Sequence, residues 1–161
     1  MQYIKQVVLM KNIYFDSVVR IERLHRLFLE VLKIELDSMK VRDINNVQCL
    51  ILYNIGELSL SVGELTQRGY YLGSNVSYNL KKMVSNGYIA QEPSIHDKRS
   101  SNVKLSEKGL ELYKKIDSIF DSHSDMLNKD GSDKNLVSIQ GSLNSLNDFW
   151  EGLVSSGSRR I

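Results

Sequence analysis

The sequence contains one cysteine and one proline among its 161 residues. A lone cysteine cannot form an internal disulfide, so a disulfide-stapled scaffold is excluded. Cys49 lies in the apolar run 49–52, where we expect a buried thiol that acts as a small hydrophobic side chain. Apolar surroundings raise the pKa of a thiol, which disfavours redox sensing through this residue. One cysteine and three scattered histidines offer no convincing metal site, and we expect no cofactor.

Long hydrophobic runs are also missing. No apolar stretch approaches the roughly 20 residues that span a membrane. Residues 1–6 lack the basic start and the apolar centre of a secretion signal, which favours a cytoplasmic protein. Hydrophobic content of 42% and charged content of 25% are ordinary for a soluble globular chain, and the length fits one domain over residues 1–161.

Signatures of catalysis are absent as well. No glycine-rich phosphate loop follows a predicted strand, no paired carboxylates stand in a recognisable context, and Cys49 has no histidine near it in the sequence. We therefore predict that the protein is not an enzyme. Because catalytic groups can be far apart in sequence, a small enzyme stays open as an alternative.

Positive charge is concentrated in one stretch. Residues 66–108 contain seven basic and three acidic residues, a net charge of +4, whereas the whole chain carries only +2. The rest of the chain is therefore slightly acidic. This distribution favours a polyanionic partner for residues 66–108, although chance clustering on a solvated face is the alternative.

Both ends of the chain predict long helices. Residues 12–39 contain no glycine or proline and carry two apolar rows at helical spacing, a wider apolar surface than one packing face needs. Residues 113–127 and 136–153 repeat apolar positions at alternating spacings of three and four, on either side of a polar turn at 130–133. Apolar rows of this kind need a partner helix to pack against. We predict a helical dimerisation region formed by residues 12–40 and 107–154.

The middle of the chain, residues 43–108, predicts a compact head. Asp43 or Asn45 can cap a helix that stops at Gly56, and residues 58–61 alternate like a short strand. Ser61 and Glu64 have the spacing of a capping box for the next helix. A further helix spans 73–87 and ends at Gly87. Strands at 88–92 and 101–105 flank a basic turn, and Ser106 can cap the helix that follows. On the buried side of the 73–87 helix we expect Val76, Leu80, Met83 and Val84.

This order of helices, strands and basic turn is that of a winged helix-turn-helix, so the fold class is mostly α with a small β wing (α+β). A helix reads base edges in the major groove with residues near its N-terminus, and lysines further along meet phosphates. An arginine at a wing tip can enter a narrow minor groove. The predicted DNA contacts are Ser74, Asn75, Ser77, Tyr78, Lys81, Lys82, Lys98 and Arg99. An ordinary surface helix is the alternative for this stretch, and a partly buried core role is the alternative for Tyr78.

Several of these segments resemble the MarR family of bacterial transcription regulators. The resemblance is carried by residues 61–65, 76–77, 80–89, 97–100 and 105–109. It implies a homodimer with intertwined terminal helices, which places two recognition helices on a palindromic operator. It also implies that Asp97 braces Arg99 in the wing.

The resemblance further implies a small effector, often an aromatic acid or another amphipathic molecule, bound where the dimer helices meet the head. The candidate effector residues are Arg20, Arg23, His25 and Tyr53, for which interface packing is the alternative. The predicted function is thus a sequence-specific regulator of transcription that binds double-stranded DNA, a ligand-responsive repressor. A winged-helix protein-interaction module or antirepressor without DNA binding is the alternative.

Overall fold

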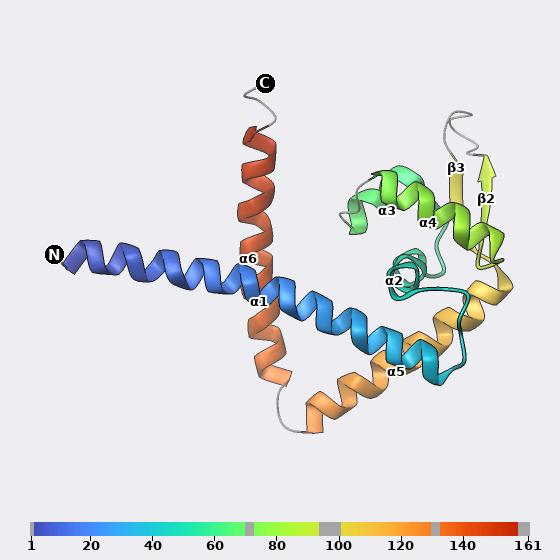
Figure 1. Cartoon of the computed structure of the whole chain (residues 1–161), viewed down its shortest axis with the longest axis horizontal. Coiled ribbons are helices and arrows are strands. Elements are labelled where there is room, and N and C mark those ends of the chain that lie inside the picture. The colour runs from blue at the N-terminus through green and yellow to red at the C-terminus, as the bar shows by residue number, and fades with distance from the viewer. Residues whose placement is uncertain (1, 70–72, 94–100, 130–132, 158–161) are drawn as a thin grey trace. The chain divides into compact units, whose positions relative to one another are not determined.

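The structure is a computed structural model that describes residues 2–69, 73–93, 101–129 and 133–157, except for the side chains of residues 2–8, 73–74 and 133–134. It is mostly helical with one small antiparallel sheet, which confirms the predicted fold class (Figure 1). The chain forms two compact units, residues 1–114 and residues 115–161. None of the described helices is long and apolar enough to cross a membrane.

The first helix, α1 (Gln2–Ser38), begins ten residues before the predicted start at residue 12. No glycine or proline interrupts residues 2–38, so nothing in the sequence stops the helix from extending. Near its C-terminal end, Leu32 and Leu36 are almost fully buried, at 2% and 3% exposure. This part of α1 packs against the second helix, α2 (Asn46–Ile55).

Helix α2 begins with a reciprocal capping box. The Asn45 side chain accepts from the backbone amide of Gln48, while the Gln48 side chain accepts from the backbone amide of Asn45. Of the two caps that the sequence allowed, the structure therefore uses Asn45. The helix lies between α1 and the helices that follow it, and its residues Cys49, Ile51, Leu52 and Ile55 are at most 1% exposed (Figure 1).

The head is completed by α3 (Val62–Gly69), α4 (Gly73–Ser85) and three strands, β1 (Leu60–Ser61), β2 (Ile89–Pro93) and β3 (Ser101–Leu105). The strand order is β1-β3-β2, with Leu60 opposite Val103 and Ile89 opposite Leu105. The short strand expected within residues 58–61 is thus confirmed as a two-residue pairing. Apolar side chains from helices and sheet form one core: Leu60, Leu65, Val76, Leu80, Met83, Ile89, Val103 and Leu105.

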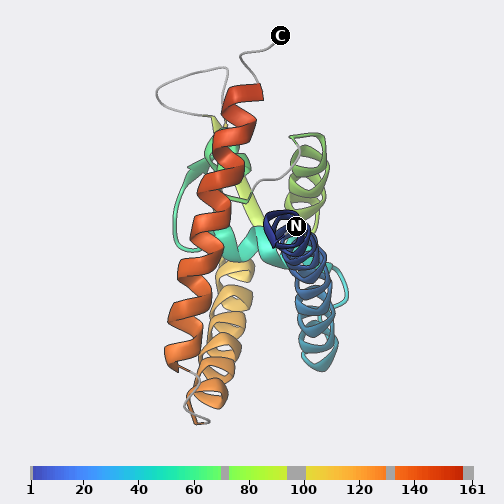
Figure 2. The ribbon, with the colours of Figure 1, turned by 90° about the vertical axis from the view of Figure 1, so that its left-hand side faces the viewer.

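Two long helices follow, α5 (Glu107–Lys129) and α6 (Asp133–Gly157). Ser106 caps α5 as predicted, because its hydroxyl accepts from the backbone amide of Gly109 at 3.1 Å. Helices α5 and α6 are each one uninterrupted helix in both views (Figure 2). Many apolar side chains of α6 are exposed: Leu136, Val137, Ile139, Leu143, Phe149, Leu153 and Val154.

Candidate nucleic-acid interface

Helix α4 has one buried and one exposed side. Val76, Leu80 and Met83 are at most 3% exposed, which confirms three of the four expected core positions. The fourth expectation is wrong, because Val84 is 39% exposed. Successive residues of an α-helix are rotated by about 100°, so Val84 turns away from the core that Met83 enters.

The exposed side of α4 carries the predicted reading residues. Asn75, Ser77, Lys81 and Lys82 are exposed, and Tyr78 is 67% exposed. This exposure places Tyr78 on the surface and removes the alternative of a core role. The side chain of Ser74 lies outside the described residues. The arrangement offers amide, hydroxyl and phenol groups on the first turns of the helix and two ammonium groups beyond them.

The start of α3 and the end of α4 are each fixed by local hydrogen bonds. Before α3, the hydroxyl and the backbone amide of Ser61 both donate to Oε2 of Glu64, at 2.8 and 2.7 Å, so the predicted capping box is confirmed. The hydrogen bonds from the Ser61 amide and then from its hydroxyl lower the pKa of Glu64. After α4, the amide of Tyr88 donates to Met83 and that of Gly87 to Val84. This is a Schellman ending, and the φ of +77° at Gly87 is one that glycine adopts without strain.

The wing strands are linked by side chains as well as by their backbones. Gln91 Nε2 donates to the Ser101 hydroxyl at 2.6 Å, and Lys104 Nζ lies 2.6 Å from Glu92 Oε1. The ion pair is about half exposed, so we expect it to contribute at most about 1 kcal/mol. The wing-tip residues Asp97, Lys98 and Arg99 lie outside the described residues, and their roles stay predictions.

Asp43 links the residues that follow α4 to α5. Its carboxylate accepts from the Tyr88 hydroxyl and from Lys108 Nζ, each at 2.6 Å, and its backbone carbonyl accepts from the Asn86 side chain. The Lys108 ammonium also lies 4.1 Å from the centre of the Tyr88 ring and donates to the Asn86 carbonyl at 2.9 Å. The hydrogen bonds from Lys108 and then from Tyr88 lower the pKa of Asp43, whereas burial, with the Asp43 hydrogen bond second, raises the pKa of Tyr88.

Gln48 makes a corresponding connection from α2 to the middle of α4. It is 2% exposed, and its Nε2 donates to Oδ1 of Asn79 at 3.1 Å. Asn79 in turn donates to the carbonyl of Asn75 at 2.8 Å. Gln48 and Asn79 are not among the site residues predicted from the sequence. The one available signal was the spacing of Asn45 and Gln48, which is that of a capping box and predicts a glutamine that folds back onto its own helix.

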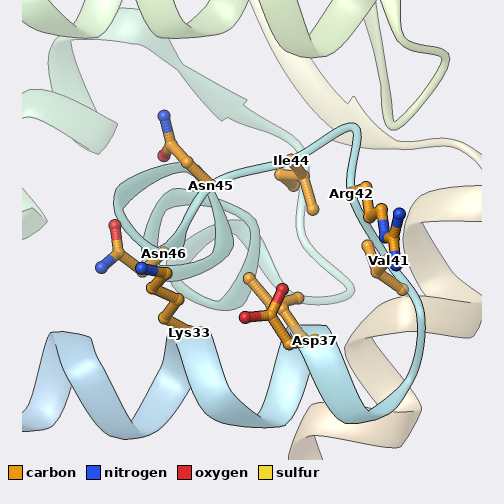
Figure 3. Close-up of a pocket in the computed structure, with 8 residues that line it drawn as sticks. Lys33, Asp37, Val41, Arg42, Ile44, Asn45 and Asn46 are labelled. Carbon is orange, nitrogen blue, oxygen red and sulfur yellow. The ribbon is translucent and has the colours of Figure 1, made fainter.

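The four candidate effector residues do not line the cavity at the C-terminal end of α1. Arg20, Arg23 and His25 are exposed on α1, and the ring of the half-buried Tyr53 lies 5.3 Å from that of Tyr113. This cavity has a volume of about 370 Å³ (Figure 3). Its lining combines charged and amide groups with apolar side chains: Lys33, Leu36, Asp37, Val41, Arg42, Ile44, Asn45 and Asn46.

The described residues contain little else that points to chemistry. Burial raises the pKa of the Cys49 thiol to about 12, so this thiol is neutral at physiological pH. Within residues 2–69, 73–93, 101–129 and 133–157, no group of three or more His, Cys, Asp or Glu residues is placed to hold a metal ion.

The fold and the exposed face of α4 define a winged helix-turn-helix protein. Residues 42–100 match the sequence model of the MarR family, as the resemblance of the sequence predicts. The match covers the head from just before α2 to the end of the wing turn. The matched family is one of transcription regulators.

One curated relative is the exopolysaccharide II synthesis transcriptional activator ExpG of Rhizobium meliloti (strain 1021), 46% identical over 99 residues. The aligned part covers 62% of this chain and 51% of the relative, so the chain spans about half the length of the curated relative that it matches.

Solved structures share the fold over most of the chain. Streptococcus pneumoniae FabT in complex with DNA superposes with a TM-score of 0.71 at 17% identity, over 87% of this chain and 99% of that one. S. aureus MepR in its DNA complex gives 0.66 at 20% identity, over 80% and 94%. The reduced form of MarR from E. coli gives 0.58 at 22% identity, over 68% and 80%.

Proposed function

We propose that the protein is a transcription regulator that binds double-stranded DNA in a sequence-specific manner through the exposed face of α4. The observation that carries the proposal is the composition of this face on a winged helix that matches the MarR family, with Asn75, Ser77 and Tyr78 near the helix start and Lys81 and Lys82 further along. Amide and hydroxyl groups can read base edges, and the lysines can contact phosphates. Ser74, as the first polar residue of α4, belongs to the same proposed set.

The wing extends the proposed contact. Lys98 and Arg99 lie in the connection between β2 and β3, where a basic tip can reach the minor groove beside the major-groove site. We assign Asp97 the role of holding the Arg99 guanidinium in place. The similar folds of FabT and MepR, both solved with DNA, support placing a wing of this kind against a duplex.

A homodimer is proposed because the terminal helices leave large apolar side chains exposed. On α1 these include Leu9, Ile13, Phe15, Leu24 and Ile34, each 49–65% exposed, and α6 adds its own apolar row. Soluble proteins rarely expose apolar surface on this scale unless it mediates association. Two copies related by a two-fold axis would present two α4 helices to a palindromic operator.

The sequence predicts a repressor, and we keep repression as the first candidate. Activation is a second candidate, favoured by the 46% identity to a protein named as a transcriptional activator. A bound dimer blocks transcription when its operator overlaps a promoter and can assist transcription from a site upstream. Deleting the gene and measuring transcripts next to the bound sites separates the two, since repression predicts a rise and activation a fall.

Response to a small aromatic or amphipathic effector completes the proposal. Arg20, Arg23, His25 and Tyr53 are the proposed contacts, on α1 and α2. A ligand changes DNA affinity only through its different affinity for two arrangements of the reading heads. A thermal-shift screen of aromatic acids, followed by DNA binding with each hit, tests this response. A hit that leaves DNA affinity unchanged would argue against it.

The decisive experiment for the function is selection of genomic fragments that the purified protein binds. We expect enrichment of a palindromic sequence, and binding to it that weakens steeply as salt is raised, because several phosphate contacts release counterions. A scrambled duplex of the same length and composition is the control. Equal binding to both duplexes would contradict sequence-specific recognition, and no binding to either would favour the alternative of a protein-interaction module or antirepressor.

A further inference from the structure

The connection between α1 and α2, residues 43–48 including the first residues of α2, makes hydrogen bonds to several elements of the head. We call it the 43–48 segment. Its side chains and carbonyl groups bond to α1, to α4, to the residues just after α4, and to α5. Such a short stretch therefore joins the helix proposed for dimerisation to the helix proposed for DNA reading.

Toward α1 the segment is held by Asn46. Its Nδ2 donates to the backbone carbonyl of Leu29 at 3.0 Å, although the two residues are 17 positions apart. Beside this contact, Leu32 and Leu36 are buried, so the C-terminal part of α1 is packed firmly against α2. Displacement of this part of α1 must therefore displace the start of α2.

The segment contacts α4 itself through Gln48. Its amide is satisfied on both sides, because Oε1 accepts from the Asn45 backbone at 3.1 Å and Nε2 donates to Asn79 at 3.1 Å. Asn79 in turn donates a hydrogen bond to the backbone carbonyl of Asn75 at 2.8 Å. At 2% exposure, Gln48 cannot itself contact DNA. Any effect of Gln48 on base reading must act through the position of α4.

The segment contacts the residues that follow α4 through Asp43. Its carbonyl accepts from the side chain of Asn86, and its carboxylate accepts from Tyr88 and from Lys108 at 2.6 Å each. Asn86 follows the last residue of α4, and Lys108 lies in the first turn of α5. The middle of α4, at Asn79, and the residues that follow its last turn are thus bonded to the same segment, which restricts both the tilt of α4 and its rotation about its own axis.

We propose that the 43–48 segment is a positioning element for base recognition, and that Gln48 is a specificity-determining residue that never touches DNA. The inference rests on the proposed function of α4. Hydrogen bonds to base edges require a functional site held to within about 0.5 Å and 10–20°, whereas phosphate contacts of lysines tolerate more movement. Loss of the Gln48–Asn79 bond should therefore reduce discrimination between sequences more than it reduces general attraction to DNA.

The test replaces Gln48 with methionine, which keeps the length of the side chain and removes its hydrogen bonds. Binding is measured by fluorescence anisotropy to the selected operator duplex and to a scrambled duplex, at several salt concentrations. Misplacing one base contact changes affinity by about tenfold. We expect operator affinity to fall by about that factor, with scrambled-duplex affinity and salt slope nearly unchanged. The matched control is Gln140→Met, at an exposed glutamine of α6.

A double-mutant cycle separates positioning from a general loss of stability. Asn79→Ala is made alone and together with Gln48→Met, and operator affinity and thermal unfolding are measured for all four proteins. If the Gln48–Asn79 bond positions α4, the double variant should distinguish operator from scrambled duplex no worse than the poorer of the two single variants does. Additive losses, or losses that follow the change in unfolding temperature for both duplexes equally, would overturn the inference.

Tyr88→Phe provides an independent variant should Gln48→Met fold poorly. It removes the hydroxyl that donates to Asp43 and keeps the ring under Lys108. We expect this variant, too, to discriminate less well between the operator and the scrambled duplex, because the contact between Tyr88 and Asp43 is lost. If the unaltered protein selects an operator and every folded variant keeps full discrimination, the positioning role is refuted alone. If the unaltered protein selects no sequence, the proposed function fails and the inference fails with it.

Discussion

The α-carbon of Gly109 lies directly against the backbone carbonyl of Tyr88, so a Cβ atom at position 109 would penetrate that carbonyl oxygen. The same oxygen accepts a hydrogen bond from the amide of Ser106 at 3.0 Å. The first turn of α5 can therefore meet the residue that leads from α4 into β2 only because position 109 has no side chain.

Gly109→Ala should destabilise the protein in spite of the better helix propensity of alanine. The added methyl group meets backbone and not a flexible side chain, and overpacking of this kind costs about 1–3 kcal/mol. Chemical denaturation would show a lower midpoint. Gly152→Ala in α6 is the matched control, since a Cβ there meets nothing within 4 Å, and we expect it to stabilise by about 0.5–1 kcal/mol. Equal stability of the two variants would contradict the close contact.

Asp43→Asn should lower stability in a pH-dependent way. The hydrogen bond from Lys108, followed by that from Tyr88, holds the pKa of Asp43 below its ordinary value, so the carboxylate contributes stability that is present above the unfolded-state pKa of about 3.9. That contribution is lost as pH falls through the lower folded-state pKa.

The free energies of unfolding of the unaltered protein and Asp43→Asn should therefore differ by a constant amount above about pH 5 and converge at more acidic pH. Because the ion pair is about half exposed, the difference should be about 1 kcal/mol or less. Asp121→Asn, at an exposed position of α5, controls for the loss of a charge. A difference that grows on acidification would be inconsistent with the depressed pKa.

Lys81→Ala and Lys82→Ala should weaken binding to operator and scrambled duplexes alike. Each lysine is exposed beyond the first turns of α4, where a phosphate contact carries no sequence information. The slope of log affinity against log salt should become shallower by about 0.9 for each phosphate that the variant no longer neutralises. Lys115→Ala on α5 is the control. An unchanged slope in either variant would remove that lysine from the proposed contact set.

Arg99→Ala should reduce affinity most for operators with A·T-rich sequence under the wing. The narrow minor groove of such sequence concentrates negative potential, which favours an inserted guanidinium. Affinities for operators with A·T-rich and G·C-rich flanks give the comparison, and Lys98→Ala controls for charge alone. Equal affinities of the variant and the unaltered protein on every operator would exclude the proposed wing contact.

Leu143→Asp should dissociate the proposed dimer. Leu143 is 45% exposed within the apolar row of α6, and a charge at an apolar interface is not compensated there. Sedimentation equilibrium should show monomers for this variant and dimers for Asn144→Asp, at the adjacent exposed position outside the row. Removal of residues 131–161 should likewise abolish the stable dimer. A dimeric truncated protein would disprove the role of α6.

The parts of the fold that depend on neighbours in sequence were predictable from the sequence. The capping box at Ser61, the stop at Gly87 and the cap at Ser106 are local devices with fixed spacings, and all three were confirmed. For α2 the sequence allowed a cap at Asp43 or at Asn45, and the structure has Asn45. The start of α1 was predicted too late because the expectation followed the apolar rows, whereas a helix also extends where nothing interrupts it.

The candidate site was predictable as a surface, but the hydrogen bonds that hold it in place were not. Periodicity identified the exposed side of α4, yet it placed Val84 on the wrong side, because an apolar residue next to the core stripe does not have to enter it. The Gln48–Asn79 bond spans 31 positions, and the Tyr88–Asp43 bond spans 45. No local pattern encodes such pairs, which exist only once α2 and α4 have packed.

The pairing of Pro93 with Ser101 has a consequence for the length of the wing connection. These two residues close the described ladder between β2 and β3, and seven residues connect them. Because the ends of the connection are held by the ladder, doubling its length costs only about 0.6 kcal/mol of closure entropy. A change in the length of the 94–100 connection should therefore cost the head little stability.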